Sequence, residues 1–263
     1  MVNNSLNRTT SLAELHALID RDRAAAAALA EATFHNDVNI AISTISEINA
    51  VAGARVSADT QVATAKIQID AEVAATRLSA DAQMAIARYK QHVESQPTAV
   101  PHEVVAAMVR QIGDSHSAQL SQQAEKAIDA IKRDAMAAIA KLKEIGNSAI
   151  DEIHDLAATV ASNVERDADV AAEKLRAFRL QAHSKRETIE EADSAARKIE
   201  AAATLSAAAL RKAVDAAIKS IRDVADGASR DIENAAKTAT ERISAARESA
   251  LGTIRVVVDF HME

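Results

Sequence analysis

The sequence predicts an all-α protein built from long, alanine-rich helices that form an elongated antiparallel helical hairpin or a coiled-coil bundle. Large apolar residues recur at every eleventh position over most of the chain. Residues that interrupt helices are scarce, with 5 glycines and 2 prolines among 263 residues, and aromatic residues make up only 2%. Eleven residues fill three turns of a nearly straight α-helix, so side chains with this spacing stay on one line along it.

This eleven-residue (hendecad) spacing predicts a packing stripe in three blocks of the chain. The stripe consists of Phe34, Ile45, Val56, Ile67, Leu78, Tyr89, Ile131, Leu142, Ile153, Val164, Leu175, Ile199, Leu210, Ile221, Ile232, Ile243 and Ile254. Because the large apolar residues are spread evenly along the chain, we expect a long seam between helices rather than one compact core.

The first helix is expected over residues 11–95. Residues 1–10 are polar and are expected to form a loose arm, with no apolar segment that would indicate a secretory signal. Ser11 and Glu14 have the spacing of a capping box, in which the two side chains satisfy free amides at a helix start. No helix-breaking residue type other than Gly53 occurs between them and Pro97.

Pro97 and Pro101 mark the clearest break, and residues 96–101 are expected to form a turn. A second long helical region then follows over residues 102–252. Gly113 and Gly146 are places where this region could kink, although the eleven-residue spacing continues past Gly146. Between 175 and 199 the spacing shifts by two residues, which we interpret as a short heptad insert.

The C-terminal tail, residues 253–263, is rich in β-branched residues. It is equally compatible with a short strand and with the end of a helix.

The first helix differs from the rest because it has two apolar faces. Its second face carries Val51, Val62, Ile69, Val73 and Met84, about 130° around the helix from the packing stripe. A helix with apolar residues on both sides requires a neighbour on each side. We therefore predict that this second face is an assembly surface that contacts another subunit.

Oppositely charged residues lie four positions apart between the two faces of the first helix. The spacing pairs Arg55 with Asp59, Lys66 with Asp70 and Arg77 with Asp81. Such pairs within a helix stabilise it only slightly, so their expected role is in register and partner choice.

No arrangement of residues in the sequence indicates catalysis, a cofactor or a metal site. None of the 8 histidines has a second histidine at the spacing of helical metal ligands, and the glycines do not form a phosphate-binding loop. The formal net charge of −7 argues against a nucleic-acid partner. The longest apolar runs are too short for a transmembrane segment. The chain has no cysteine, which favours a reducing, cytoplasmic setting.

These features predict a non-enzymatic structural protein that associates with itself into an elongated homo-oligomer, such as a filament or sheet of cytoskeletal or scaffold type. A second hypothesis is a peripheral coat on a lipid, membrane or polymer-granule surface, because amphipathic helices that lie at interfaces also use eleven-residue repeats. In composition and length the chain is similar to phasin-like and apolipoprotein-like proteins, but no motif assigns it to either family. A third hypothesis is an adaptor coiled coil.

Overall fold

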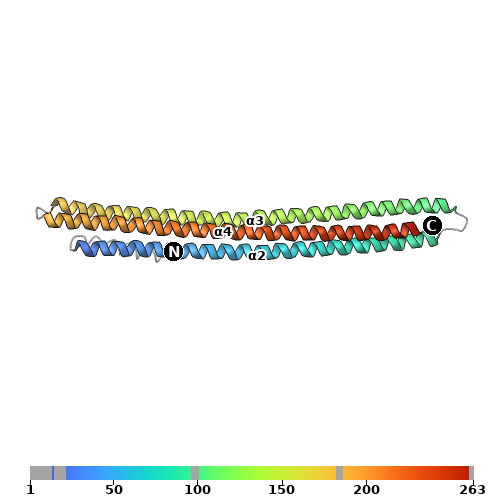
Figure 1. Ribbon diagram of the computed structural model, residues 1–263, viewed down its shortest axis with the longest axis horizontal. Coiled ribbons are helices and arrows are strands. Elements are labelled where there is room, and N and C mark those ends of the chain that lie inside the picture. The colour runs from blue at the N-terminus through green and yellow to red at the C-terminus, as the bar shows by residue number, and fades with distance from the viewer. Residues whose placement is uncertain (1–13, 15–21, 96–100, 182–185, 261–263) are drawn as a thin grey trace. The chain divides into compact units, whose positions relative to one another are not determined.

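The computed structural model describes residue 14 and residues 22–95, 101–181 and 186–260. These ranges contain three long helices, α2 (Arg23–Glu94), α3 (His102–Gln181) and α4 (Arg186–Phe260). The helices pack in a bundle, and no strand occurs in these ranges (Figure 1). The all-α class and the packing of long helices are therefore as the sequence predicts.

The chain divides into two compact units, and each contains a segment of every helix. Unit 1 comprises Met1–Ala54 and Gly146–Asp223, and unit 2 comprises Arg55–Ile145 and Val224–Glu263. Each unit has its own cluster of buried side chains, with Phe34, Leu175 and Ile199 in unit 1 and Ile67, Ile131 and Ile243 in unit 2.

The helix expected over 11–95 is not continuous, because Glu14 and α2 are helical and Asp22 between them is not. α2 begins at Arg23, because the side chain of Asp22 caps it. The Asp22 Oδ1 atom accepts hydrogen bonds from the backbone amides of Ala24 (3.0 Å) and Ala25 (3.2 Å). An N-terminal aspartate in this position satisfies amides that have no partner within the helix. The expected arm over 1–10 and the Ser11 cap lie outside the described residues.

The α2–α3 connection falls where the two prolines predict it. α2 ends at Glu94, and most of the expected turn, residues 96–100, lies outside the described residues. α3 begins immediately after Pro101, whose carbonyl oxygen accepts hydrogen bonds from the amides of Val104 (3.0 Å) and Val105 (3.3 Å). α3 continues as helix through both Gly113 and Gly146.

The sequence leaves open whether the helical region over 102–252 is one rod or folds back, and the structure shows two antiparallel helices, α3 and α4. In unit 1, Arg176 Nη2 of α3 lies 2.5 Å from Glu200 Oε1 of α4, and Leu175 and Ile199 share one core. The chain therefore reverses direction between Gln181 and Arg186. The shift in spacing that we interpreted as a heptad insert, part of which lies outside the described residues, marks this reversal. No proline or glycine signals it.

The strand alternative for the C-terminal tail is wrong for its described part. α4 continues as helix to Phe260. Ile254 is buried and Val258 packs against the core of unit 2, so tertiary packing overrides the β-propensity of these residues. Residues 261–263 lie outside the described ranges.

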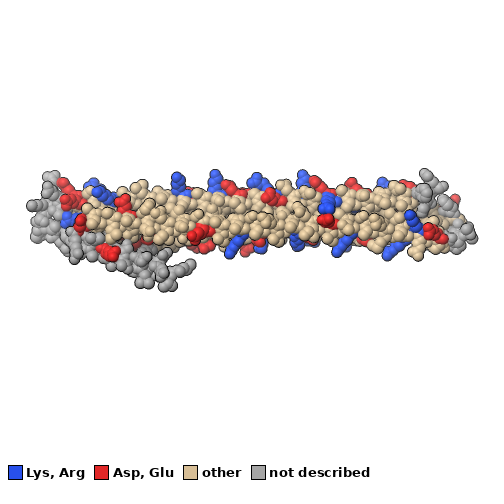
Figure 2. Space-filling view, turned by 90° about the horizontal axis from the view of Figure 1, so that it is seen from below, with Lys and Arg blue, Asp and Glu red and all other residues tan. Residues whose placement is uncertain are grey.

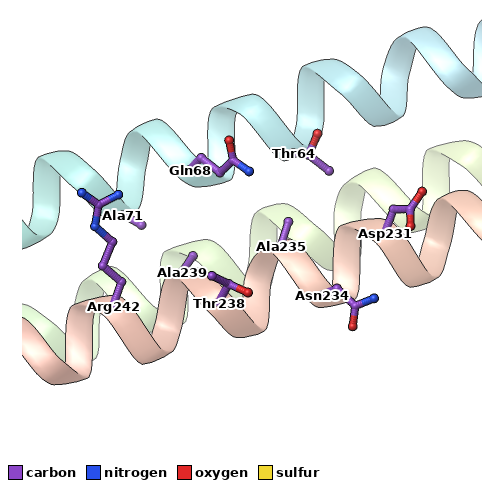
Figure 3. A pocket seen from close by; sticks show the side chains of 9 residues that line it. All are labelled: Thr64, Gln68, Ala71, Asp231, Asn234, Ala235, Thr238, Ala239 and Arg242. Carbon is purple, nitrogen blue, oxygen red and sulfur yellow. The ribbon is translucent and has the colours of Figure 1, made fainter.

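In unit 2, α2 is antiparallel to α3 and parallel to α4. Lys66 of α2 contacts Asp134 of α3. Asp59, about two turns earlier on α2, contacts Lys141, which lies further along α3. Glu72 contacts Arg242 of α4, whereas the earlier residue Thr64 lies opposite Asp231 (Figure 3). The core of unit 2 therefore lies between three helix segments whose buried sides face one another.

Candidate assembly surface on helix α2

Every residue of the predicted packing stripe lies in the interior, with at most 2% of its surface exposed. The buried line on α3 begins earlier than the sequence analysis proposed. Val109 and Leu120 are also buried, and they continue the spacing of eleven backwards from Ile131. The pattern that would have identified them was therefore present in the sequence.

The residues of the predicted second face lie on the opposite side of α2 and are exposed. In unit 2 the exposed fractions are 68% for Val62, 60% for Ile69, 41% for Val73 and 52% for Met84, against 1% for the stripe residue Ile67. In unit 1, Val51 is exposed in the same way, and so is Ile40, eleven residues before it, which the sequence analysis did not include.

In unit 2 the large residues of the second face belong to a longer line of exposed, uncharged side chains, which we call the α2 outer stripe. Its members follow one another at intervals of three or four residues. They are Ala58, Val62, Ala65, Ile69, Val73, Thr76, Ala80, Met84 and Ala87. Residues at these intervals form a continuous ridge on a helix, the pattern that packs against a neighbouring helix. Thr76 is the only polar member.

On the α3 side, the outer stripe is bordered by ion pairs between helices. Lys66 Nζ lies 2.8 Å from Asp134 Oδ2, and Lys141 Nζ lies 3.0 Å from Asp59 Oδ2. The hydrogen bond with Asp134 and the charge of its carboxylate raise the pKa of Lys66. The structure thus pairs Lys66 and Asp59 with α3 and not, as the spacing of four suggested, with Asp70 and Arg55.

On the α4 side, a groove of about 420 Å³ lies between α2 and α4 (Figure 3). It is lined on α2 by Thr64, Gln68 and Ala71, none of which belongs to the outer stripe. Small side chains lie between the helices, among them Ala71 and Ala235, while Gln68 and Asn234 are at the edges. The Arg242 side chain extends from α4 towards α2, where its Nη2 atom lies 3.8 Å from Glu72 Oε1. The groove contains no histidine and none of the arrangements that activate a nucleophile.

Figure 2 views the molecule from below Figure 1 and therefore from the side of α2. Uncharged residues cover most of the surface between the two margins, and lysine, arginine, aspartate and glutamate side chains gather mainly along those margins. The middle of this view is therefore poor in charge, in agreement with the uncharged members of the outer stripe.

Two buried hydroxyl groups bond to the backbone of their own helices. The Thr60 hydroxyl donates a hydrogen bond to the Val56 carbonyl oxygen (2.6 Å), and Ser229 does the same to Ala225 (2.8 Å). Among the described residues, no group of three or more histidine, aspartate or glutamate side chains is arranged to hold a metal ion. None of their helices combines the length and apolar character needed to cross a membrane.

Helix α2 is joined to α3 by a polar contact that the sequence analysis did not anticipate. Tyr89 was identified only as a stripe residue, but its hydroxyl donates a hydrogen bond to the carbonyl oxygen of Val109. Gly113, one turn further along α3, leaves space for this hydroxyl. A Cβ atom on Gly113 would lie 3.3 Å from Tyr89 Oη and 2.8 Å from Val258 Cγ2.

Comparison with known proteins supports the fold and nothing more specific. The chain is similar to a solved structure described as a "Computationally designed three helix bundle", with a TM-score of 0.58 and 14% sequence identity, over 95% of this chain and 97% of that one. No family model and no curated protein matches the sequence. The likeness is to a protein made for its fold, so it agrees with the three-helix arrangement and carries no activity with it.

Proposed function

We propose that this chain is a non-enzymatic structural protein that associates with further copies of itself through the α2 outer stripe. The observation that carries the proposal is the length of this stripe. Over some thirty residues of α2, from Ala58 to Ala87, it exposes only uncharged side chains, four of them large and apolar. The packing stripe of the same helix already makes the contacts with α3 and α4. The outer stripe is therefore available for a contact with another molecule.

Two physical arguments favour a helix as the occupant of this surface. Removing apolar side chains from water is favourable in proportion to the area buried, and Val62, Ile69, Val73 and Met84 supply most of that area. The alanines between them permit close approach of a second helix, which adds van der Waals contacts. The absence of cysteine leads us to propose a reducing setting such as the cytoplasm for this assembly.

The alternative of a lipid or granule coat is less well supported by the same surface. Helices that bind at a lipid interface usually carry aromatic or leucine anchors, with lysine and arginine along the polar side. The α2 outer stripe contains neither an aromatic residue nor a leucine. Acidic side chains take part in the ion pairs at both of its margins.

The test introduces one charge on each face of α2. Val73→Asp places a carboxylate in the outer stripe, and we expect it to keep the helical circular dichroism spectrum and unfolding transition while lowering the molar mass measured by light scattering to that of one chain. Ile67→Asp places a carboxylate in the core, where the cost of burying it should disrupt the fold.

Ser79→Asp is the matched control, because Ser79 is exposed on α2 but lies outside the outer stripe. This variant should assemble like the wild type. Assembly that survives Val73→Asp, or equal loss of folding in Val73→Asp and Ile67→Asp, would show that the outer stripe is not the assembly surface.

A further inference from the structure

We propose that two copies of the chain meet through the α2 outer stripe in parallel and in register, forming a closed dimer. This inference rests on the proposed function and specifies the partner and its direction. It follows from an asymmetry between the charges on the two sides of the stripe in unit 2.

The side of the stripe nearer α3 is basic. Its exposed residues recur every eleven positions and form what we call the basic flank. They are Arg55, Lys66, Arg77 and Arg88. With three turns in eleven residues, this flank lies about 30° beyond the line of Val62 and Val73. Lys66 is paired with Asp134, while Arg55, Arg77 and Arg88 have no ion-pair partner among the described residues.

The side nearer α4 carries acidic and amide side chains, which we call the acidic flank. They are Gln61, Glu72, Gln83 and Glu94, all exposed. This flank lies about 30° beyond the line of Ala65 and Thr76. Glu72 is paired with Arg242. The acidic flank therefore contains no cation. On the other side, Asp59, Asp70 and Asp81 lie about 30° beyond the basic flank, so the arginines and Lys66 are the charged side chains nearest to the stripe there.

The direction of the second helix decides which flanks meet. When two copies of a helix pack in parallel, opposite flanks face each other, so basic meets acidic along both margins. When they pack antiparallel, each flank faces its own copy, so the arginines of the two basic flanks oppose one another. Each exposed pair contributes little energy. Together, however, the pairs attract one another in the parallel arrangement, whereas the arginines repel one another in the antiparallel arrangement.

Register follows from the same repeat. In a parallel pair without stagger, Arg88 of one copy faces Gln83 and Glu94 of the other, and every large residue of the stripe meets its own copy. A stagger of eleven residues keeps the pattern but removes one repeat from the contact. The unstaggered arrangement has two-fold symmetry, and both chains use the same surface. No outer stripe is left free, so the assembly is a closed dimer. Growth beyond a dimer would then require a different surface.

The absence of native cysteine allows a direct test by disulfide cross-linking. Val62→Cys and Met84→Cys place single thiols near the two ends of the outer stripe, at exposed positions whose substitution leaves the core intact. Under mild oxidation of the full chain, each variant alone should form a disulfide-linked dimer. Ser79→Cys, on α2 but outside the stripe, should remain monomeric on a non-reducing gel.

The outcomes separate this inference from the proposed function. Disulfide formation only in a mixture of the two variants would show an antiparallel contact and overturn the inference while leaving self-association intact. The inference would also be overturned if light scattering shows a dimer but neither variant, alone or mixed with the other, forms a disulfide. A wild-type chain that is monomeric at all concentrations would refute the proposed function itself.

A charge exchange provides an independent readout. Arg88→Glu should raise the dissociation constant of the dimer, because it places a carboxylate opposite Glu94 of the second copy. Adding Glu94→Arg to that variant should restore the affinity. Tighter association of Arg88→Glu alone would indicate that basic flanks face one another and would contradict the parallel arrangement.

Discussion

Tyr89 and Gly113 show how single residues set the approach of two helices in unit 2. The Tyr89 ring lies in the core, and its hydroxyl reaches the Val109 carbonyl oxygen on α3. A backbone carbonyl oxygen within a helix has a second lone pair, and the Tyr89 hydroxyl bonds to that of Val109. Gly113 makes the contact possible, because even a methyl group there would approach the stiff, β-branched Val258 side chain too closely.

Gly113→Ala should therefore destabilise the protein although alanine is the better helix former. We expect a loss of about 1–3 kcal/mol in the free energy of unfolding, since overpacking outweighs helix propensity. Gly227→Ala is the control in the same unit, because no atom lies within 4 Å of a Cβ placed there, and it should gain about 0.5–1 kcal/mol. Urea unfolding followed by circular dichroism measures both. A stabilised Gly113→Ala variant would show that the contact is loose.

The titration of Tyr89 gives a pH dependence with a definite sign. Burial of the phenol, together with the nearby Asp114 carboxylate, raises the pKa of Tyr89 above 10.0, and a hydrogen bond with the Gly113 backbone opposes this shift. The folded protein thus holds the phenolic proton more tightly than the unfolded chain does. Its contribution to stability is complete below the unfolded pKa and is lost as the pH rises through the folded pKa.

This titration can be observed directly, because Tyr89 is the only tyrosine and tryptophan is absent. The ultraviolet absorbance of tyrosinate should appear at higher pH in the folded protein than in urea, and the melting temperature should fall over the same interval. A native titration curve that coincides with the curve in urea would contradict the buried, hydrogen-bonded state of the hydroxyl.

At the scale of helices, local residue chemistry predicts some boundaries and not others. Pro97 and Pro101 predicted the α2–α3 break, because proline cannot continue a helix. The place of the reversal, between Gln181 and Arg186, was not predicted because the sequence there consists of residues compatible with a helix. Its only trace was the change of spacing between Leu175 and Ile199, which a heptad insert explains equally well.

The helical state of residues 253–260 was not predictable from propensity alone. Thr253 and Val256–Val258 favour strands in general. Ile254 and Val258, however, continue the buried side of α4 at helical spacing, and the eleven-residue line through Ile243 was the stronger signal. The exposed face of α2 could be predicted, because two apolar lines on one helix require two environments. The ion pairs between helices could not, because they depend on how the helices are aligned.

The start of α2 yields a prediction at this scale. Asp22→Ala removes the acceptor for the Ala24 and Ala25 amides and should cost about 0.5–2 kcal/mol, with faster hydrogen exchange in the first turn of α2. Asp22→Asn keeps a capping oxygen and should restore most of the protection. Unchanged exchange in Asp22→Ala would mean that the cap does not hold the helix start.

At the scale of the whole molecule, one stripe of α2 packs into the fold, and the other is the surface through which we propose that copies of the chain associate. The packing stripe of α2, which includes Ile67, is covered by α3 and α4 in unit 2. The outer stripe is not covered by the described residues, and its large side chains remain in contact with water. A contiguous exposed apolar surface of this kind is uncommon on a protein that acts alone. We therefore propose that this surface contacts other copies of the chain.

The most direct test of this central claim is the molar mass of the purified wild-type chain, measured by light scattering over a series of concentrations with and without anionic lipid vesicles. We expect a highly helical protein of at least twice the mass of one chain in the absence of lipid, with no gain of helix when vesicles are added. A chain that is monomeric at every concentration and becomes helical only on vesicles would contradict it and favour the coat.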